Sequence, residues 1–473
     1  MVFKFKHKNK KKQKKVNLSK AAFIKILLSL LLIASFSIFT LFLHGQGNKH
    51  KFVVVLDQRG FEPYKIVIHK GDTVDFVNYS GKYFWPASDI HPTHQIYPQF
   101  DPKRAFGPNQ DWSFKFDRVG AWPYHDHLFI YYTGVVVVLD KNKNSLDPNY
   151  SCKKTSDQNM LACWEEMIQV ALEQKGIQGA FNLLDKLYHT QPVFAKNCHD
   201  YAHWIGQYSY IYYYSKTGKL NLTKDATICG NGFYHGFMET FVRVNPDPAA
   251  SRKFCEYVRK QVGNASADSC YHGIGHGLIG LDPNTWGNEL LSAKDSLRRC
   301  EQITSNKNNL ANCESGVFAN IATYEATGEY SLKINKKNPL LLCFELADKY
   351  KQTCFQGMRI ALDYVYNGNI DKEIAYILNI KNKQYQTYLI QAIAGDEMYQ
   401  TIGHWNFDKE IQRCQALPDY LYHYCLDSFI GQVIEISGAA DGVNEGNIFC
   451  SSDMLSAADK NYCLGIVKQS VYN

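Results

Sequence analysis

The pattern of apolar and polar residues along this chain of 473 residues predicts two different kinds of structure. Between about residues 50 and 140, short runs of β-branched and aromatic residues are separated by Gly, Pro and Asp. The runs are KFVVVLD, YKIVIH, TVDFVNY, WSFKFD and VVVVLD. Runs of this length between turn residues predict β-strands. Several short strands in one segment predict a small all-β domain, a Greek-key sandwich or barrel.

The second pattern is helical. A polar stretch at 141–158, KNKNSLDPNYSCKKTSDQ, reads as a linker after the β domain. Over 159–473, apolar residues recur at helical spacing and end at Gly or Asn-Gly, as in LACWEEMIQVALEQKG and GAFNLLDKLYHT. This spacing predicts an all-α domain, so the chain is expected to be a multidomain protein.

The 14 cysteines all lie after residue 150, most of them in close pairs that recur along the helical part. Recurring pairs predict a repeated helix–turn–helix unit and an α-solenoid-like array stapled by disulfides. The expected bonds are Cys152–Cys163, Cys255–Cys270, Cys300–Cys313, Cys343–Cys354, Cys414–Cys425, Cys450–Cys463 and, by elimination, Cys198–Cys229. An even count without CxxC spacing indicates an oxidising, extracytoplasmic compartment and not a zinc domain.

The N-terminal segment predicts how the protein is held at the membrane. Ten lysines and no acidic residue fall in residues 1–25, and residues 26–43 are uncharged. We interpret 1–20 as a basic cytoplasmic tail and 21–44 as a transmembrane signal-anchor, so that a single-pass cell-membrane protein presents its folded domains outside. A cleaved signal peptide is the alternative, but its apolar core is normally shorter and ends at small residues.

The formal charge of +7 does not indicate a nucleic-acid partner. Residues 1–25 hold ten of the 52 basic residues, so the rest of the chain, with 45 acidic residues, is slightly negative. A basic tail is not a basic patch on a folded face, so no nucleic acid is expected as a partner.

Two pairs of histidines in the β domain predict a metal site. His125 and His127 lie two residues apart in GAWPYHDHLFIYYTG, and His91 and His94 lie upstream. Side chains two residues apart on an extended strand point the same way. A second pair from a facing loop would complete three or four nitrogen ligands, a set that suits Cu(II) and would also hold Zn(II). The alternative is a domain without metal whose histidines are packed in the core.

The residues around these pairs resemble a cupredoxin of the plastocyanin and azurin kind. Phe61-Glu-Pro63 and IVIHKGDTVDFVN, which ends at Asn78, resemble its opening, and Gly120-Ala-Trp-Pro-Tyr124 resembles its last ligand loop. The resemblance implies that the first ligand is His94 or its neighbour His91. The remaining ligands then come from the last loop, at His125 and His127.

One departure from the cupredoxin pattern changes the expected site. The segment holds neither the Cys nor the Met of a blue-copper site, and WPYHDH is similar to the Tyr-His-Ser-His loop of multicopper oxidase domains. The resemblance therefore implies an all-imidazole copper site that is pale and not blue. Asp89 and Asp101 are candidate partners for the imidazole N–H groups, and Asp126 is given no ligand role.

Further histidines lie in three consecutive repeats of the helical part. Each of these repeats holds two candidate ligands four residues apart, a spacing that places both on one helix face. The pairs are His199 and His203, His235 and Glu239, and His272 and His276. The later repeats CESGVFA, CFQGMRI and CLDSFIG keep the cysteine and have no histidine. A cluster restricted to stacked neighbours indicates a transition-metal site, for zinc or iron, or an acid/base site. Core histidines bonded to the backbone are the alternative.

This Cys-x-x-Gly-x-x-His array resembles helical domains of uncharacterised exported bacterial proteins, a resemblance that implies no activity. The chain lacks CxxCH and HExxH, so covalent haem and a zinc peptidase have no support. We therefore expect a membrane-anchored, extracytoplasmic copper-binding protein that acts in copper handling, delivery or redox chemistry. The alternatives are a metalloenzyme with its metal on the helical histidines and a non-catalytic scaffold whose array binds a protein partner.

Overall fold

A computed structural model describes residues 51–145, 157–395, 398, 401–402 and 404–472. The expected tail at 1–20 and signal-anchor at 21–44 lie outside these residues, as does most of the linker. Within the described ranges, no helix has both the length and the apolar character that crossing a bilayer requires.

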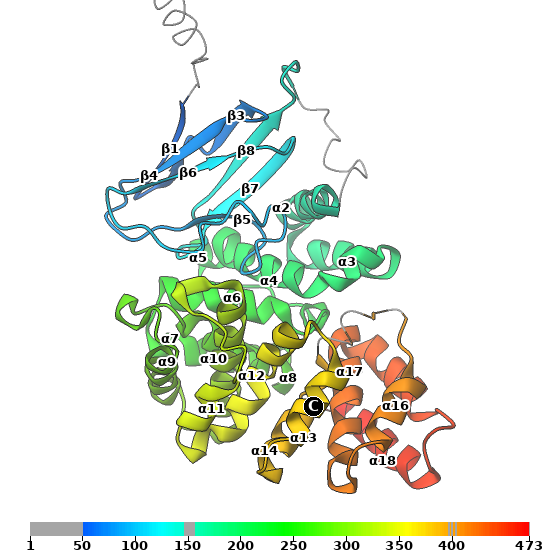
Figure 1. Cartoon of the computed structure of the whole chain (residues 1–473). Helices are drawn as coiled ribbons and strands as arrows, with labels where there is room; N and C mark the ends of the chain where they lie inside the picture. The colour runs from blue at the N-terminus through cyan, green and yellow to red at the C-terminus, as the bar shows by residue number, and fades with distance from the viewer. Residues whose placement is uncertain (1–50, 146–156, 396–397, 399–400, 403, 473) are drawn as a thin grey trace, which may run out of the picture. The chain divides into compact units, whose positions relative to one another are not determined.

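The N-terminal part is a sandwich of two four-stranded sheets (Figure 1). Its strands are β1 (Lys51–Asp57), β2 (Gly60–Glu62), β3 (Lys65–His69), β4 (Thr73–Asn78), β5 (Pro86–Ser88), β6 (Asp111–Lys115), β7 (Gly120–Asp126) and β8 (Thr133–Leu139). One sheet has the order β2-β1-β4-β6 and the other β3-β8-β7-β5. The pair β3 and β8 is parallel, whereas β7 is antiparallel to both β5 and β8.

The core of the sandwich explains why these segments form strands. On β4, Val74 and Phe76 are fully buried, as are Val136 and Val138 on β8. Residues two apart share one face of a strand, so each sheet turns an apolar face inward. The ring of Phe76 packs on that of Tyr124 across the core, with centroids 5.3 Å apart. Tyr124 thereby anchors β7, the strand that leads into the histidine loop.

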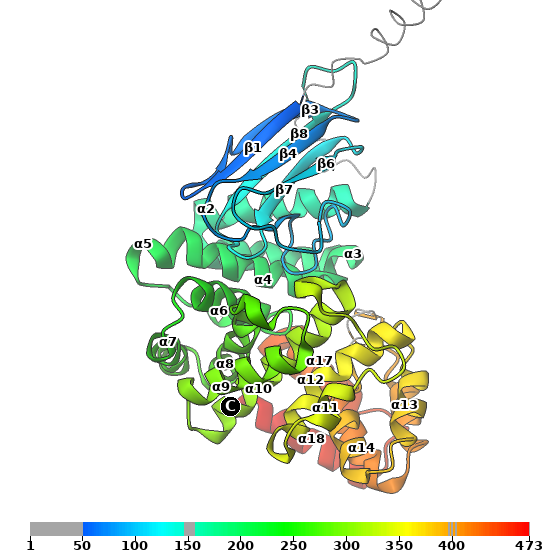
Figure 2. The same ribbon diagram turned by 60° about the vertical axis from the view of Figure 1, so that its left-hand side comes forward.

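The C-terminal part is helical, as its periodicity predicts. Its α-helices are α2 (Asp157–Thr190), α3 (Pro192–Lys196), α4 (Cys198–Ser209), α5 (Ser215–Thr217), α6 (Gly232–Val244), α7 (Pro248–Gln261), α8 (Asn264–Leu278), α9 (Glu289–Ile303), α10 (Lys307–Thr327), α11 (Leu341–Glu345), α12 (Lys351–Tyr366), α13 (Ile370–Leu378), α14 (Lys383–Ile390), α16 (Phe407–Gln415), α17 (Asp419–Cys450) and α18 (Ala457–Tyr472). Shorter turns include η1 (Tyr210–Tyr214), η2 (Lys224–Thr227) and η4 (Glu329–Ser331). Figures 1 and 2 both show the sandwich beside α2 and α4.

Local sequence signals set several helix ends. Asp247 accepts hydrogen bonds from the backbone N–H groups of Ala249 and Ala250 at the start of α7, where Pro248 is the first helical residue. Asn306 caps α10 in the same way, and α10 ends at Gly328, whose φ of 80° is left-handed. These are the residues that helix starts and stops favour.

Six disulfides join described cysteines, and all six are pairs that the sequence predicts. Five join consecutive helices: Cys255–Cys270, Cys300–Cys313, Cys343–Cys354, Cys414–Cys425 and Cys450–Cys463. The sixth, Cys198–Cys229, links the start of α4 to the turn before α6. Cys163 is also disulfide-bonded, and its expected partner Cys152 lies outside the described residues.

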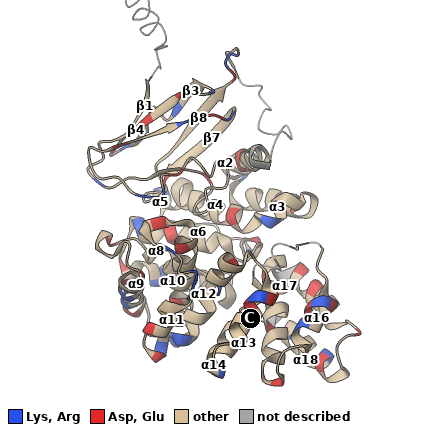
Figure 3. Cartoon of the chain, in the orientation of Figure 1, with Lys and Arg blue, Asp and Glu red and all other residues tan. Residues whose placement is uncertain are grey.

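The helices of successive repeats pack in a row, α4 on α6, α6 on α8, α8 on α10 and α10 on α12. An α-solenoid-like array would be open at its far end. Here α17 returns to the start of the row, where the N–H groups of Cys229 and Gly230 donate to the carbonyls of Ile436 and Glu435, each at 3.3 Å. Figure 3 shows acidic and basic residues mixed along the helices.

Candidate metal centre

The four histidines of the β domain come from two chain segments that one strand pair brings together. His125 is in β7 and His127 follows the end of that strand, while His91 and His94 lie in the loop after β5. β5 pairs with β7 with Ala87 opposite His125, so the loop that follows β5 begins beside β7, where the N–H of Asp89 donates to the carbonyl of Pro123. All four histidines are buried, with exposed fractions of 0 to 2%.

One nitrogen of each histidine faces a carboxylate. His91 Nε2 lies 3.0 Å from Glu239 Oε1, and His94 Nδ1 lies 2.5 Å from Asp101 Oδ2. His125 Nδ1 contacts Asp89 Oδ1, and His127 Nε2 lies 3.0 Å from Glu329 Oε2. For His91, His94 and His125, the carboxylate beside one ring nitrogen holds the proton on that nitrogen and leaves the lone pair on the other. His127 Nε2 lies near Glu329 but makes no hydrogen bond within the described part of the chain. The expected partners Asp89 and Asp101 are both found.

The remaining nitrogens face one another. His91 Nδ1 lies 3.2 Å from His125 Nε2, and His127 Nδ1 lies 3.2 Å from His94 Nε2. The four histidines each offer one nitrogen within 4.8 Å of the others. With the protons of His91 and His125 held on their outer nitrogens, the inner nitrogens of this pair both present lone pairs, which repel. A cation at the centre removes this repulsion, so the donor set fits a metal ion that prefers imidazole.

Protonation would be the other way to satisfy the inner nitrogens, and the electrostatics oppose it. Burial lowers the pKa of His91 to about 4 and lowers those of His94 and His127. These three rings therefore stay neutral near pH 7 and remain available as ligands.

The helical part completes this centre. Glu239 lies in α6 and Glu329 in η4, and each faces a histidine of the β domain. Asp200 of α4 accepts hydrogen bonds from the side chains of Thr93 and Gln95, in the loop that holds His94. The sequence interpretation placed Glu239 in a second, helical site, whereas its carboxylate contacts His91. Glu329 was not predicted, because a lone glutamate in a short turn carries no recognisable pattern.

The carboxyl groups around the centre differ in charge. Despite burial, the neighbouring histidines hold the pKa values of Asp89, Asp101 and Glu239 below their usual range. Burial raises the pKa of Glu165, next to Asp89, and that of Glu329 well above the usual value, which favours the uncharged form of both carboxyl groups. Three anionic carboxylates, those of Asp89, Asp101 and Glu239, thus face His125, His94 and His91.

Two cations lie among these carboxylates. Lys103 Nζ is 2.6 Å from Asp101 Oδ2, and Arg243 Nη2 is 3.4 Å from Glu239 Oε1. The three anionic carboxylates therefore outnumber the nearby basic side chains. A metal cation between the four rings would offset that excess negative charge.

Aromatic rings close the site. Trp85 packs on His127 with ring centroids 4.5 Å apart, and its Nε1–H donates to Asp101 Oδ1 at 2.9 Å. The ring of Tyr330 also packs on His127, with centroids 5.6 Å apart. Asp126 points elsewhere, accepting from the N–H groups of Trp85 and Leu128, which agrees with giving it no ligand role.

The predicted helical histidines form a second cluster. His199 and His203 on α4, His235 on α6, and His272 and His276 on α8 are in ring contact in a chain. Two triads each offer three nitrogens within 4.8 Å of one another, one with His199, His203 and His235 and the other with His235, His272 and His276. Glu239 belongs to neither triad, although it lies one helical turn from His235.

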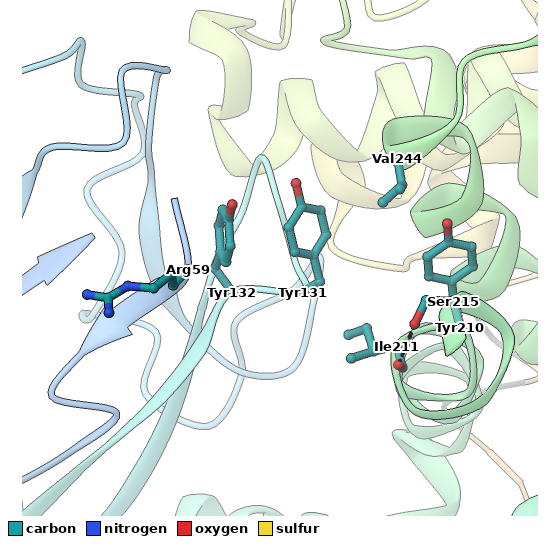
Figure 4. A pocket seen from close by; sticks show the side chains of 7 residues that line it. All are labelled: Arg59, Tyr131, Tyr132, Tyr210, Ile211, Ser215 and Val244. Atoms are coloured by element: carbon teal, nitrogen blue, oxygen red, sulfur yellow. Dashed lines mark hydrogen bonds between the residues drawn. The ribbon is translucent and has the colours of Figure 1, made fainter. Parts of the chain in front are cut away.

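A separate pocket of about 270 Å³ lies between the β7–β8 loop and the helices (Figure 4). Its lining consists of Arg59, Tyr131, Tyr132, Tyr210, Ile211, Ser215 and Val244. These residues include no histidine and no carboxylate, so this pocket is not part of either cluster.

No protein-family model and no curated protein sequence matches this chain. Similar solved structures are cupredoxins. A purple cupredoxin from Nitrosopumilus maritimus has 15% identity and a TM-score of 0.17, covering 19% of this chain and 99% of its own. Amicyanin from Paracoccus versutus has 18% identity and a TM-score of 0.16, covering 20% of this chain and 87% of its own. At these scores the likeness supports no conclusion by itself, and the proposals below rest on the residues of this chain.

Proposed function

We propose that this protein holds a copper ion between His91, His94, His125 and His127. The observation that carries the proposal is the arrangement of their nitrogens: each outer nitrogen faces a carboxyl group, and the inner nitrogens face one another across 3.2 Å gaps. Four neutral imidazoles without a thiolate suit Cu(II). The cupredoxin-like motifs around the same histidines favour copper over Zn(II), which the donor set would also accept.

Burial favours a resident ion over one that is passed on quickly. The four rings are almost fully buried, and Trp85 and the helical part cover them. Release of the ion would require the β-domain loop and its contacts with Asp200 and Glu239 to open. We therefore infer copper retention, with a structural or redox role at the bound ion, in place of rapid copper delivery.

We also propose that this centre lies on the outer side of a membrane. The anchor expected at 21–44 supports that location, as do the disulfides of the helical part, which form in oxidising compartments. A protein partner on the helical array remains a prediction from its repeat pattern.

A copper titration tests the proposal. The full-length protein, kept in detergent because of the apolar stretch at 26–43, is titrated with Cu(II) and its copper content measured after gel filtration. A variant carrying His94→Gln and His125→Gln should lose one tightly bound copper per chain, because glutamine keeps a similar size but is a poor copper ligand.

The matched control is His423→Gln, which removes an exposed histidine whose partner is Asp459. It should bind copper as the unmodified protein does. If the double variant folds, by circular dichroism and thermal melting, and still retains the same copper content, the proposed site is wrong.

A further inference from the structure

The stacking of α4, α6 and α8 depends on glycines and not on the histidines. A Cβ at Gly236 would lie 2.0 Å from the carbonyl oxygen of His203, and one at Gly273 would lie 2.8 Å from the Cα of His235. The same contact recurs along the row, where a Cβ at Gly316 would lie 2.0 Å from the His272 carbonyl oxygen. The helices can approach this closely only because these positions lack a side chain.

These contacts define equivalent positions in successive repeats. The residues that precede or face the glycines are His203, His235, His272, Ser315 and Gln356. The row continues past the third histidine with a serine and a glutamine, and the same close packing is kept at Gly316 and Gly357. Histidine is therefore not required by the packing, and its presence in three adjacent repeats needs another explanation.

The hydrogen bonding of the histidines points to a ligand. Both nitrogens of His276 and the Nδ1 atoms of His203 and His235 are buried without a hydrogen-bond partner among the described residues. His203 is 2% and His235 8% exposed. Buried polar atoms are normally paired, and leaving one unpaired costs free energy. Each triad combines such histidines, His203 with His235 in one and His235 with His276 in the other, and offers three nitrogens within 4.8 Å of one another, a donor set for a metal ion.

From this geometry we infer that the helical histidines bind a divalent transition-metal ion, in a centre where His235 is common to both triads. This inference does not depend on copper binding in the β domain. Imidazole ligands accept Zn(II), Fe(II) or Cu(II), so the class of ion is a first-row transition metal.

Glu239 lies between the two histidine groups. Its Oε1 is 3.0 Å from His91 Nε2, while Oε2 is buried with no hydrogen-bond partner in the described part of the chain. Glu239 lies on α6 one helical turn from His235, so the carboxylate that faces His91 is on the same helix as the ligand common to both triads.

Zinc binding in a background without the β-domain site tests this inference. Full-length protein carrying His94→Gln and His125→Gln is loaded with Zn(II), desalted and analysed for metal. It should retain at least one zinc per chain and lose it when His235→Gln is added. Glutamine occupies the equivalent position at 356, so this substitution is compatible with the packing.

A second variant distinguishes the loss of metal ligands from a loss of folding. His203→Gln with His276→Ala removes one ligand from each triad and should also abolish zinc binding. Gln356 stands at the position equivalent to His203, and Ala319 follows Gly316 by three residues as His276 follows Gly273, so later repeats already accept both residues. His423→Gln, the exposed control, should leave it unchanged. No zinc in the parent background, or undiminished zinc in the folded His235→Gln variant, would overturn the inference. Neither result bears on copper at the β-domain site, which is measured by the His94 and His125 variants alone.

Discussion

The substitution Glu239→Gln removes one negative charge beside His91 and changes the shape of the side chain little. Glu239 is fully buried, and its Oε1 accepts from His91 Nε2 at 3.0 Å. The carboxylate raises the basicity of the imidazole and holds its proton on the outer nitrogen. A glutamine oxygen can still accept this hydrogen bond, but a neutral acceptor is about half as strong as a charged one. Copper affinity should therefore fall about tenfold, or about 1.4 kcal/mol.

The same substitution affects stability through a different residue. Arg243 Nη2 lies 3.4 Å from Glu239 Oε1, and the arginine side chain is almost fully buried. Removing one partner of a buried ion pair leaves a charge without compensation and costs about 3 kcal/mol. Urea unfolding of the metal-free variant should show this loss, while its copper affinity is read separately.

The assay is a competition for Cu(II) between the protein and a chelator of known affinity, at pH 7.5. The matched control is Glu314→Gln on α10, a buried glutamate that accepts from Thr353 Oγ1 at 3.0 Å. The control should bind copper as the unmodified protein does. If folded Glu239→Gln also binds copper with unchanged affinity, the helical part does not support the centre as described.

Three further predictions follow from the two histidine groups and the glycine contacts. The copper-loaded protein should show no intense thiolate-to-copper absorption band, since the described cysteines are all disulfide-bonded; an intense band in the visible spectrum would contradict an all-imidazole site. Burial lowers the pKa values of His91 and His276 to about 4, whereas in the unfolded chain a histidine has a pKa of about 6.5. As the pH falls from 7.5 to 5, the unfolded chain therefore takes up protons that the folded protein does not, and the metal-free protein should lose about 2 kcal/mol of its free energy of unfolding per histidine. Urea titrations at the two pH values measure this loss, and a free energy of unfolding that does not change with pH would contradict the prediction. Gly236→Ala should lower the free energy of unfolding by about 3 kcal/mol, because its Cβ would lie 2.0 Å from the His203 carbonyl oxygen. In the control Gly431→Ala, the new Cβ has no atom within 4 Å, so the protein should be as stable as before or more stable. Equal melting temperatures for the two variants would refute the close approach of α4 and α6.

Local patterns were sufficient for much of the architecture. The five strands expected from β-branched runs are all present, because alternation with turn residues is a property of each short segment. The short strands β2 and β5 were not predicted, since three residues are too few to show a period. The cysteine pairs were predictable because their partners are close in sequence and face each other across one helix–turn–helix unit.

The contacts between distant segments were not predictable from one sequence. The spacing of His125 and His127 and the motif around them identified the β-domain cluster, and Asp89 and Asp101 lie near enough in sequence to be suspected. Glu239 is 148 residues from His91, and its position i+4 to His235 made a helical ligand the simpler expectation. The return of α17 to Cys229 likewise depends on how the repeats turn along the row.

Anomalous diffraction at the copper absorption edge, from crystals of the copper-loaded protein, would locate the ion. We expect a peak enclosed by the inner nitrogens of His91, His94, His125 and His127. Copper that is bound in stoichiometric amount but gives no peak between these four side chains would contradict this expectation.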